Sequence, residues 1–202
     1  MLFEMQEMPA AARYKLLTAT ITPRPVAWVT TLSAGGILNV APFSCFNLMG
    51  HTPPMVAIGM QPRADGRLKD TCANIAATGE MTINLVTFRD AEAMVATSAE
   101  FPADVDEAAA AELTLTPSTH ILPPRIATAP VSLECRQFRI IEVGPDQTII
   151  LGEVIAAHVK EEFVMDPDRC AIDTPALELV GRMQGPGWYV RCSDLFRIDN
   201  PA

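Results

Sequence analysis

The basic segment "PRADGRLKDT", residues 62–71, has the residue types of an anion-binding loop. It places Arg63, Arg67 and Lys69 directly before a segment that the sequence predicts as a helix. The first N–H groups of a helix lack intrahelical acceptors and lie at the positive end of its dipole, which suits them to a phosphate. The alternative is a solvated basic loop in which Asp70 caps its own helix.

A second segment with chemical potential is "LNVAPFSCFNLMG", residues 38–50, which has the length of a strand but an unusual composition. Side chains alternate between the two faces of a strand, so both faces would mix polar with apolar residues. Asn39, Ser44 and Asn47 are the polar members, and Pro42 cannot donate to a sheet ladder. The pattern leaves open which polar group this strand faces.

Composition limits the function classes. The 202 residues are 49% hydrophobic and 19% charged, which favours one globular domain over residues 1–202 with a substantial core. A net charge of −9 disfavours nucleic-acid binding but leaves room for a local anion site. No apolar run reaches the roughly 18 residues typical of a membrane helix. The N-terminal segment lacks the pattern of a secretory signal, so the expected location is the cytoplasm.

The metal-ligating residue types are scattered. The five cysteines form no C-x-x-C pair, and the three histidines are also scattered along the chain. We therefore expect neither a disulfide framework nor a metal site. No Ser/His/Asp or Cys/His arrangement indicates a catalytic nucleophile, so the catalytic residues are left unassigned.

The elements that position these segments are mostly strands. Helices are expected at 69–78, ended by Gly79 and capped by Asp70 or Thr71, and at 88–99. The Pro-rich stretch 100–130, with one or two helical turns in "DEAAAAEL", is expected to be a functional cover or a packed connector. The expected strands are 25–33, 38–50, 54–60, 80–86, the hairpin 131–143 with 148–159, and 187–198.

This order of elements favours a mainly β fold with helices. The first strands follow one another too closely for parallel crossovers, and no G-x-G-x-x-G is present, so a Rossmann fold is not expected. A β-barrel with helical additions fits better.

Three stretches together resemble a known family. "PRPVAWVTTLSAGGILNVAPFSCFN", "PP" at 53–54 and "KDTCANIAATGEMTINLV" are similar in order and spacing to the flavin reductase-like, FMN-binding split-barrel family. The resemblance extends from about residue 18 to the end of the chain. It implies a split β-barrel, a homodimer, and FMN bound near the subunit interface.

The resemblance also implies site residues. The flavin ring and ribityl chain would contact Thr30, Thr31, Asn39, Ala41, Ser44, Cys45 and Asn47. The phosphate side would comprise Arg67, Lys69, Asp70 and Thr71, and Phe101 lies where the family's lid-like loop begins. Asp70 is assigned capping or loop ordering, because its carboxylate would repel a phosphate. Without the resemblance, Thr30 and Thr31 are ordinary residues of a half-buried strand, and Trp28, Phe43 and Phe46 are expected in the core.

The function implied by the resemblance is hydride transfer from NAD(P)H to FMN, with the protein orienting the flavin. FMN either stays bound or is released to a monooxygenase or another redox partner. A second interpretation is a flavoredoxin-like electron-transfer protein without NAD(P)H activity. A third is a barrel without flavin whose basic loop is only surface.

Overall fold

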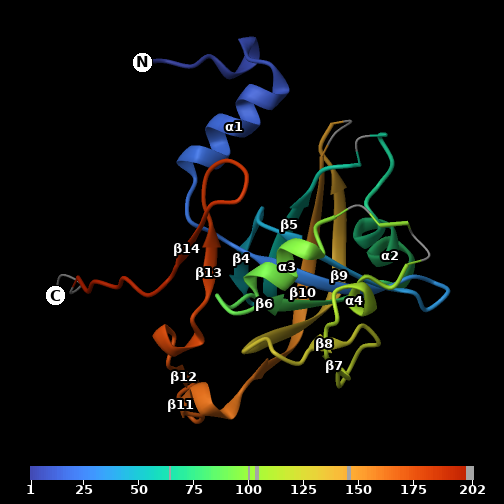
Figure 1. Ribbon diagram of the computed structural model, residues 1–202, viewed down its shortest axis with the longest axis vertical. Helices are drawn as coiled ribbons and strands as arrows, with labels where there is room; N and C mark the ends of the chain where they lie inside the picture. The colour runs from blue at the N-terminus through green and yellow to red at the C-terminus, as the bar shows by residue number, and fades with distance from the viewer. Residues whose placement is uncertain (64, 100, 103–104, 145–146, 199–202) are drawn as a thin grey trace.

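The computed structural model describes residues 1–63, 65–99, 101–102, 105–144 and 147–198. Its largest unit is an antiparallel sheet that wraps around a core, with short helices packed on the outside (Figure 1). The strands of this sheet, in the order in which they pair, are β3 (Leu38–Phe43), β2 (Ala27–Leu32), β6 (Glu80–Leu85), β9 (Val131–Glu142), β10 (Thr148–Val159), β5 (Pro54–Met60) and β4 (Phe46–His51). The expected strands at 54–60 and 80–86 are confirmed.

The hairpin of β9 and β10 is the longest pairing in the sheet, and it too is confirmed. The two expected turn residues 145 and 146 lie outside the described residues. The register of the β9–β10 pairing shifts between Leu151 and Gly152, as at a β-bulge. A Cβ at Gly152 would lie 2.3 Å from Cε of Met81, so a residue without a side chain fits this close approach.

Smaller strand pairs surround the main sheet. β1 (Arg24–Pro25), β13 (Val180–Arg182) and β14 (Tyr189–Arg191) form a three-stranded sheet. The remaining pairs are β7 (Leu115–Thr116) with β8 (Arg125–Ile126), and β11 (Val164–Asp166) with β12 (Ala171–Ile172).

Two apolar clusters lie on the two faces of β2, because successive side chains of this strand point to opposite sides. Ala27 and Val29 belong to one cluster, which includes the buried Phe43 and packs against Phe46. Trp28 belongs to the other cluster and is fully buried. The expected core positions of the tryptophan and the two phenylalanines are therefore confirmed.

The segment 38–50 is two strands rather than the single one expected. β3 and β4 lie at opposite edges of the sheet, separated in the chain by Ser44 and Cys45 alone. The Cys45 carbonyl accepts a hydrogen bond from the Gly59 N–H at 2.7 Å, next to the first residue pair of β4 with β5, so the chain has already joined β5 at Cys45. Pro42 is tolerated because β3 is an edge strand.

The α-helices of the described residues lie outside the sheet: α1 (Ala10–Thr20), α2 (Asp70–Thr78), α3 (Ala91–Ala96) and α4 (Glu107–Ala110). The 3₁₀ helices are η1 (Met5–Glu7), η2 (Glu161–Phe163) and η3 (Pro175–Leu177). α2 ends as expected at Gly79, whose φ of 74° is in the left-handed region that glycine adopts without strain. The N-cap of α2 is Lys69, so the expectation of Asp70 or Thr71 was wrong.

Other expectations on element length were also wrong. The helix expected at 88–99 is confined to α3, and the strand expected at 187–198 to β14, which pairs only with the three residues of β13. α4 supplies the helical turn expected in the stretch 100–130, of which residues 100 and 103–104 lie outside the described residues. None of the helices in the described part of the chain is long and apolar enough to cross a membrane.

The projecting helix α1 was not predicted, and it contains no buried residue (Figure 1). Arg24 fastens its C-terminal end: Nη1 donates to the carbonyls of Thr18 at 2.7 Å and Ile21 at 2.8 Å. Nη2 of the same side chain donates to the Met183 carbonyl at 3.1 Å, next to β13. The helix is thus held through backbone carbonyls rather than through an apolar face.

Candidate functional site

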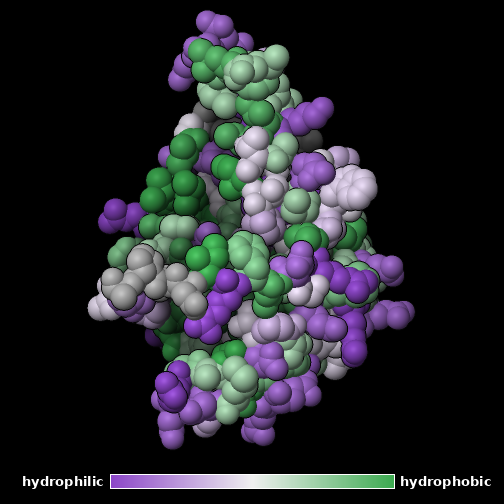
Figure 2. Space-filling view, turned by 90° about the vertical axis from the view of Figure 1, so that its left-hand side faces the viewer, coloured by the Kyte–Doolittle hydropathy of each residue, from purple (hydrophilic) through white to green (hydrophobic). Residues whose placement is uncertain are grey.

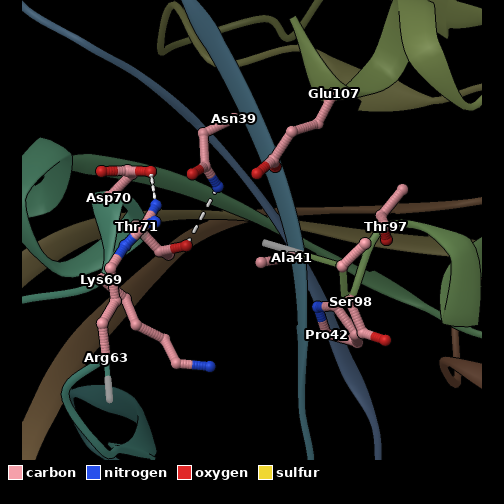
Figure 3. A pocket seen from close by; sticks show the side chains of 11 residues that line it. Asn39, Ala41, Pro42, Arg63, Lys69, Asp70, Thr71, Thr97, Ser98 and Glu107 are labelled. Carbon is pink, nitrogen blue, oxygen red and sulfur yellow. Dashed lines mark hydrogen bonds and ion pairs between the residues drawn. The ribbon is translucent and has the colours of Figure 1, made fainter. Parts of the chain in front are cut away.

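A cavity of about 70 Å³ lies between β3, the loop before α2, the first turn of α2 and the end of α3 (Figure 3). Its walls carry both charges and hydroxyl groups. The lining residues are Asn39, Ala41, Pro42, Arg63, Lys69, Asp70, Thr71, Thr97, Ser98, Ala99 and Glu107.

Side-chain hydrogen bonds fix α2 against the sheet. Nδ2 of Asn39, on β3, donates to Oγ1 of Thr71 at 3.0 Å. Nδ2 of Asn74, one turn along the helix, donates to Oγ1 of Thr31, on β2, at 3.1 Å. All four side chains are buried, so the start of α2 is held in a defined position beside the cavity.

The charged groups of the cavity come from the loop and the helix start. Arg63 forms an ion pair with Asp70, and its Nη2 lies 3.5 Å from the Phe101 carbonyl. The Lys69 ammonium lies 5.6 Å from the centroid of the Phe43 ring, within range of a cation–π contact. No side chain in the described part of the chain caps the N-terminus of α2. This end of the cavity is therefore suited to an anion.

Asp70 does not cap α2, so the capping role proposed from the sequence was wrong. Its pairing with Arg63 joins the two ends of the loop 63–70. Within this loop the Gly66 N–H donates to the Arg63 carbonyl at 2.9 Å, and the Arg63 N–H donates to the Arg67 carbonyl at 2.8 Å.

A buried carboxyl group completes the wall opposite the loop. Glu107, on α4, is only 6% exposed, and its Oε2 accepts a hydrogen bond from the Val40 N–H at 2.5 Å. Burial raises the pKa of Glu107 to about 7, although the Val40 hydrogen bond opposes the shift. The group is thus close to half-protonated at neutral pH.

A second and larger cavity, of about 320 Å³, shares Pro42 and Ser98 with the first. Its other walls come from α1, from Val26 between β1 and β2, from α3 and from the C-terminal strands. Among the residues that line this cavity, the guanidinium of Arg182 lies 4.6 Å from the centroid of the Tyr189 ring. The lining residues are Tyr14, Val26, Pro42, Phe43, Ser44, Met94, Val95, Ser98, Arg182, Gly187 and Tyr189.

The structure brings together part of the residues assigned from the sequence. In the first cavity lie Asn39, Ala41, Lys69, Asp70 and Thr71, and the second cavity contains Ser44. The Phe101 carbonyl lies 3.5 Å from Nη2 of Arg63, and the Thr31 hydroxyl accepts a hydrogen bond from Asn74 of α2.

Thr31 and Phe101 do not themselves line either cavity, and neither do the four remaining assigned residues. Thr30 is buried on the other face of β2, where its hydroxyl donates to the Pro124 carbonyl at 2.5 Å. Cys45 and Asn47 are exposed, and Oδ1 of Asn47 accepts from the Leu48 N–H. Arg67 lies on the outside of the loop, where it pairs with Asp65 at 2.7 Å.

Sequence reasoning missed several lining residues. Arg63 was visible as a third cation of the basic segment but was not assigned to the site. Glu107 stood out as an acidic residue in an alanine-rich segment, which was interpreted only as a cover. No signal in the sequence marks Thr97, Arg182 or Tyr189, because tertiary contacts alone bring them to the cavities.

Among the described residues, no cluster of three or more His, Cys, Asp or Glu side chains could hold a metal ion.

Comparison with known proteins gives a consistent result. The family model described as "Flavin reductase like domain" matches residues 19–170. Among solved structures, 2-nitrobenzoate 2-nitroreductase from Pseudomonas fluorescens is 34% identical, with a TM-score of 0.90 over 100% of this chain and 96% of that one. Nitrilotriacetate monooxygenase component B from Bacillus cereus is 30% identical, with a TM-score of 0.91 over 98% of each chain.

A split-barrel protein from Shewanella frigidimarina, described as a flavin reductase, is 21% identical, with a TM-score of 0.84 over 100% of both chains. This likeness bears on the fold alone. The main sheet described above is therefore a split β-barrel, as the sequence resemblance implied.

Proposed function

The chain belongs to the flavin reductase-like family, and from this premise we propose that it is an FMN-dependent oxidoreductase that accepts hydride from NAD(P)H. One observation carries the proposal: a small cavity at the start of α2, lined by Lys69 and Arg63, adjoins a larger one whose walls are both apolar and polar. This pair of cavities matches the two ends of FMN, a phosphate and a planar ring system.

The residues of the first cavity fit a single phosphate. Lys69 and the uncapped start of α2 supply a charge and backbone N–H donors, and the Thr71 hydroxyl lies beside them. The cations of this cavity, Lys69 and Arg63, lie at one end beside the start of α2, which favours the single phosphate of FMN over the two of FAD.

The residues of the second cavity fit the ring. Val26, Phe43, Met94 and Val95 offer apolar contacts, while Ser44 offers a hydroxyl group. A volume of about 320 Å³ lies in the range of small-molecule sites.

The bound flavin would supply the hydride-accepting centre, and the chain would bind and orient it. The position of α2, fixed by the Asn39 and Asn74 hydrogen bonds, would set the phosphate and thereby the ring beyond it. The open side of the second cavity would admit nicotinamide. The final acceptor is then a monooxygenase partner or a small nitro compound, as the names of the two relatives at 30% and 34% identity suggest.

We further propose that the protein is a homodimer. Hydrophobic side chains gather on the face that carries α1 and the C-terminal strands (Figure 2). Ile21, at the end of α1, is 61% exposed, and Trp188, just before β14, is 65% exposed. Exposed apolar surface on one face is typical of an interface. Twofold dimers are the commonest closed assembly, and a second copy placed here would lie beside the second cavity.

The experiment is rapid mixing of the anaerobic FMN-loaded protein with NADH and, separately, with NADPH. Loss of flavin absorbance near 450 nm during turnover, with either nucleotide, is the expected result. If dithionite bleaches the flavin but neither nucleotide does, the protein is an electron carrier instead. If FMN does not bind at all, the flavin assignment is wrong.

A further inference from the structure

Glu107 is the feature that a simple phosphate site does not explain. Val40 belongs to the edge strand β3, and its outward N–H is taken up by Oε2 of Glu107. The other carboxyl oxygen, Oε1, has no hydrogen-bond partner among the residues that the structure describes. The side chain reaches the cavity from above β3, on the side away from Lys69 (Figure 3).

The charges around Glu107 do little to stabilise its ionised form. Across the cavity stand Arg63, Asp70 and Lys69, and the first two form an ion pair with each other. Asp106, on its own segment, adds a second negative charge, while β3 and the end of α3 present no titratable side chain. Burial, Asp70 and Asp106 therefore raise the pKa of Glu107, and Arg63 and the Val40 N–H compensate only in part.

A phosphate bound in this cavity would share it with the Glu107 carboxyl, which is one of the lining groups. An ionised carboxylate would repel it, whereas a protonated carboxyl offers an O–H donor. Protonation of Glu107 therefore replaces a carboxylate that repels the phosphate with a carboxyl that donates a hydrogen bond to it.

We propose that Glu107 is a ligand-binding residue that carries its proton in the complex, so that phosphate binding in this cavity takes up one proton. The inference rests on the proposed function, with the FMN phosphate as the ligand. Oε2 keeps the Val40 hydrogen bond, and Oε1 carries the proton toward the phosphate. Binding then weakens as the pH rises, because the free protein must first be protonated.

The size of the effect follows from proton linkage. With a free-protein pKa of about 7, roughly nine-tenths of Glu107 is ionised at pH 8, so FMN binding takes up about 0.9 proton there. The Kd for FMN rises about 50-fold between pH 7 and pH 9. The FMN phosphate itself has a second pKa of about 6 and contributes little over this range.

The test is calorimetric titration of the wild-type protein with FMN at pH 8 in two buffers of different ionisation enthalpy. A binding enthalpy that differs between the buffers by the amount expected for about 0.9 proton supports the proposal. Equal enthalpies in both buffers overturn it. Riboflavin, which lacks the phosphate, takes up no proton if the phosphate is the partner of Glu107.

The variant test uses Glu107→Gln, which keeps a donor at this position but cannot titrate. It is expected to bind FMN with nearly the same Kd at pH 7 and pH 9, while the control Glu92→Gln, at an exposed position on α3, keeps the wild-type dependence. A Glu107→Gln protein that retains the full pH dependence contradicts the proposal. Should that variant not fold, the wild-type titration still decides.

The two proposals fail in different ways. Absence of FMN binding at pH 6 to pH 7 removes the proposed function. FMN binding that is tight and independent of both pH and buffer leaves the proposed function intact and removes only the role of Glu107.

Discussion

Replacing Lys69 with alanine is expected to weaken FMN binding and to leave riboflavin binding nearly unchanged. Two cations line the first cavity, but Arg63 is already paired with Asp70. Within the described part of the chain, the Lys69 ammonium contacts only the Phe43 ring, 5.6 Å from its centroid, and it is therefore the cation more readily available to a phosphate.

The magnitude follows from the strength of one charge-assisted hydrogen bond. Such a bond contributes about 1.5–3 kcal/mol, which corresponds to an increase in Kd of about 10- to 150-fold. Lys69 is only partly buried, so solvent screens its charge and the lower part of this range is expected. The same reasoning predicts that the loss becomes smaller at high salt.

The assay is titration of apoprotein with FMN and with riboflavin, followed by quenching of flavin fluorescence. Lys15→Ala, at an exposed position of α1, is the matched control and is expected to bind both flavins like the wild type. An equal loss for both flavins would show that Lys69 acts on folding or on the ring. Full retention of FMN affinity would place the phosphate elsewhere.

Three further predictions concern stability and assembly. Glu134→Gln is expected to lower the free energy of unfolding by about 2–4 kcal/mol in urea melts, because this buried carboxylate accepts hydrogen bonds from two backbone N–H groups and from His158. Burial alone would raise the pKa of Glu134, but these hydrogen bonds lower it. The stabilisation by Glu134 is therefore present above the unfolded-state pKa and disappears as the pH falls through the lower folded-state pKa. A series of urea melts from pH 7 to pH 3 checks this. Arg24→Met is expected to release α1, seen as faster tryptic cleavage at Arg13 and Lys15, and unchanged cleavage would contradict the anchoring role. Light scattering at micromolar concentration is expected to give twice the chain mass of 21.8 kDa, and a value near 21.8 kDa would exclude the dimer.

The regular elements with a strong local pattern were predictable from the sequence. The hairpin of β9 and β10 has β-branched residues on both strands, and Gly79 marks the end of α2. The helix α1 was missed because it buries no residue and so has no apolar face to recognise. The break within 38–50 was missed because the pairing of Gly59 with Cys45 is a long-range contact.

The candidate site was predictable where its residues lie in the two segments that stand out in the sequence, 38–50 and 62–71. Lys69 stands out in the basic segment that precedes α2, whereas Asn39, Ala41 and Ser44 were assigned through the family resemblance. Thr30 was misplaced relative to the cavity because the sequence alone does not say which face of β2 meets α2. The partners from distant segments, such as Arg182 and Tyr189, depend on how the C-terminal strands fold back.

The short connection between β3 and β4 has a consequence for which insertions the fold tolerates. These strands form the two edges of the seven-stranded sheet, and five other strands separate them laterally. Ser44 and Cys45 are nevertheless the whole covalent link between them, and Pro42 and Ser44 also border the second cavity. Lengthening this link by a few residues would loosen both the connection between the two edge strands and the wall of the second cavity. The same insertion at the exposed turn 34–36 would only lengthen a surface loop.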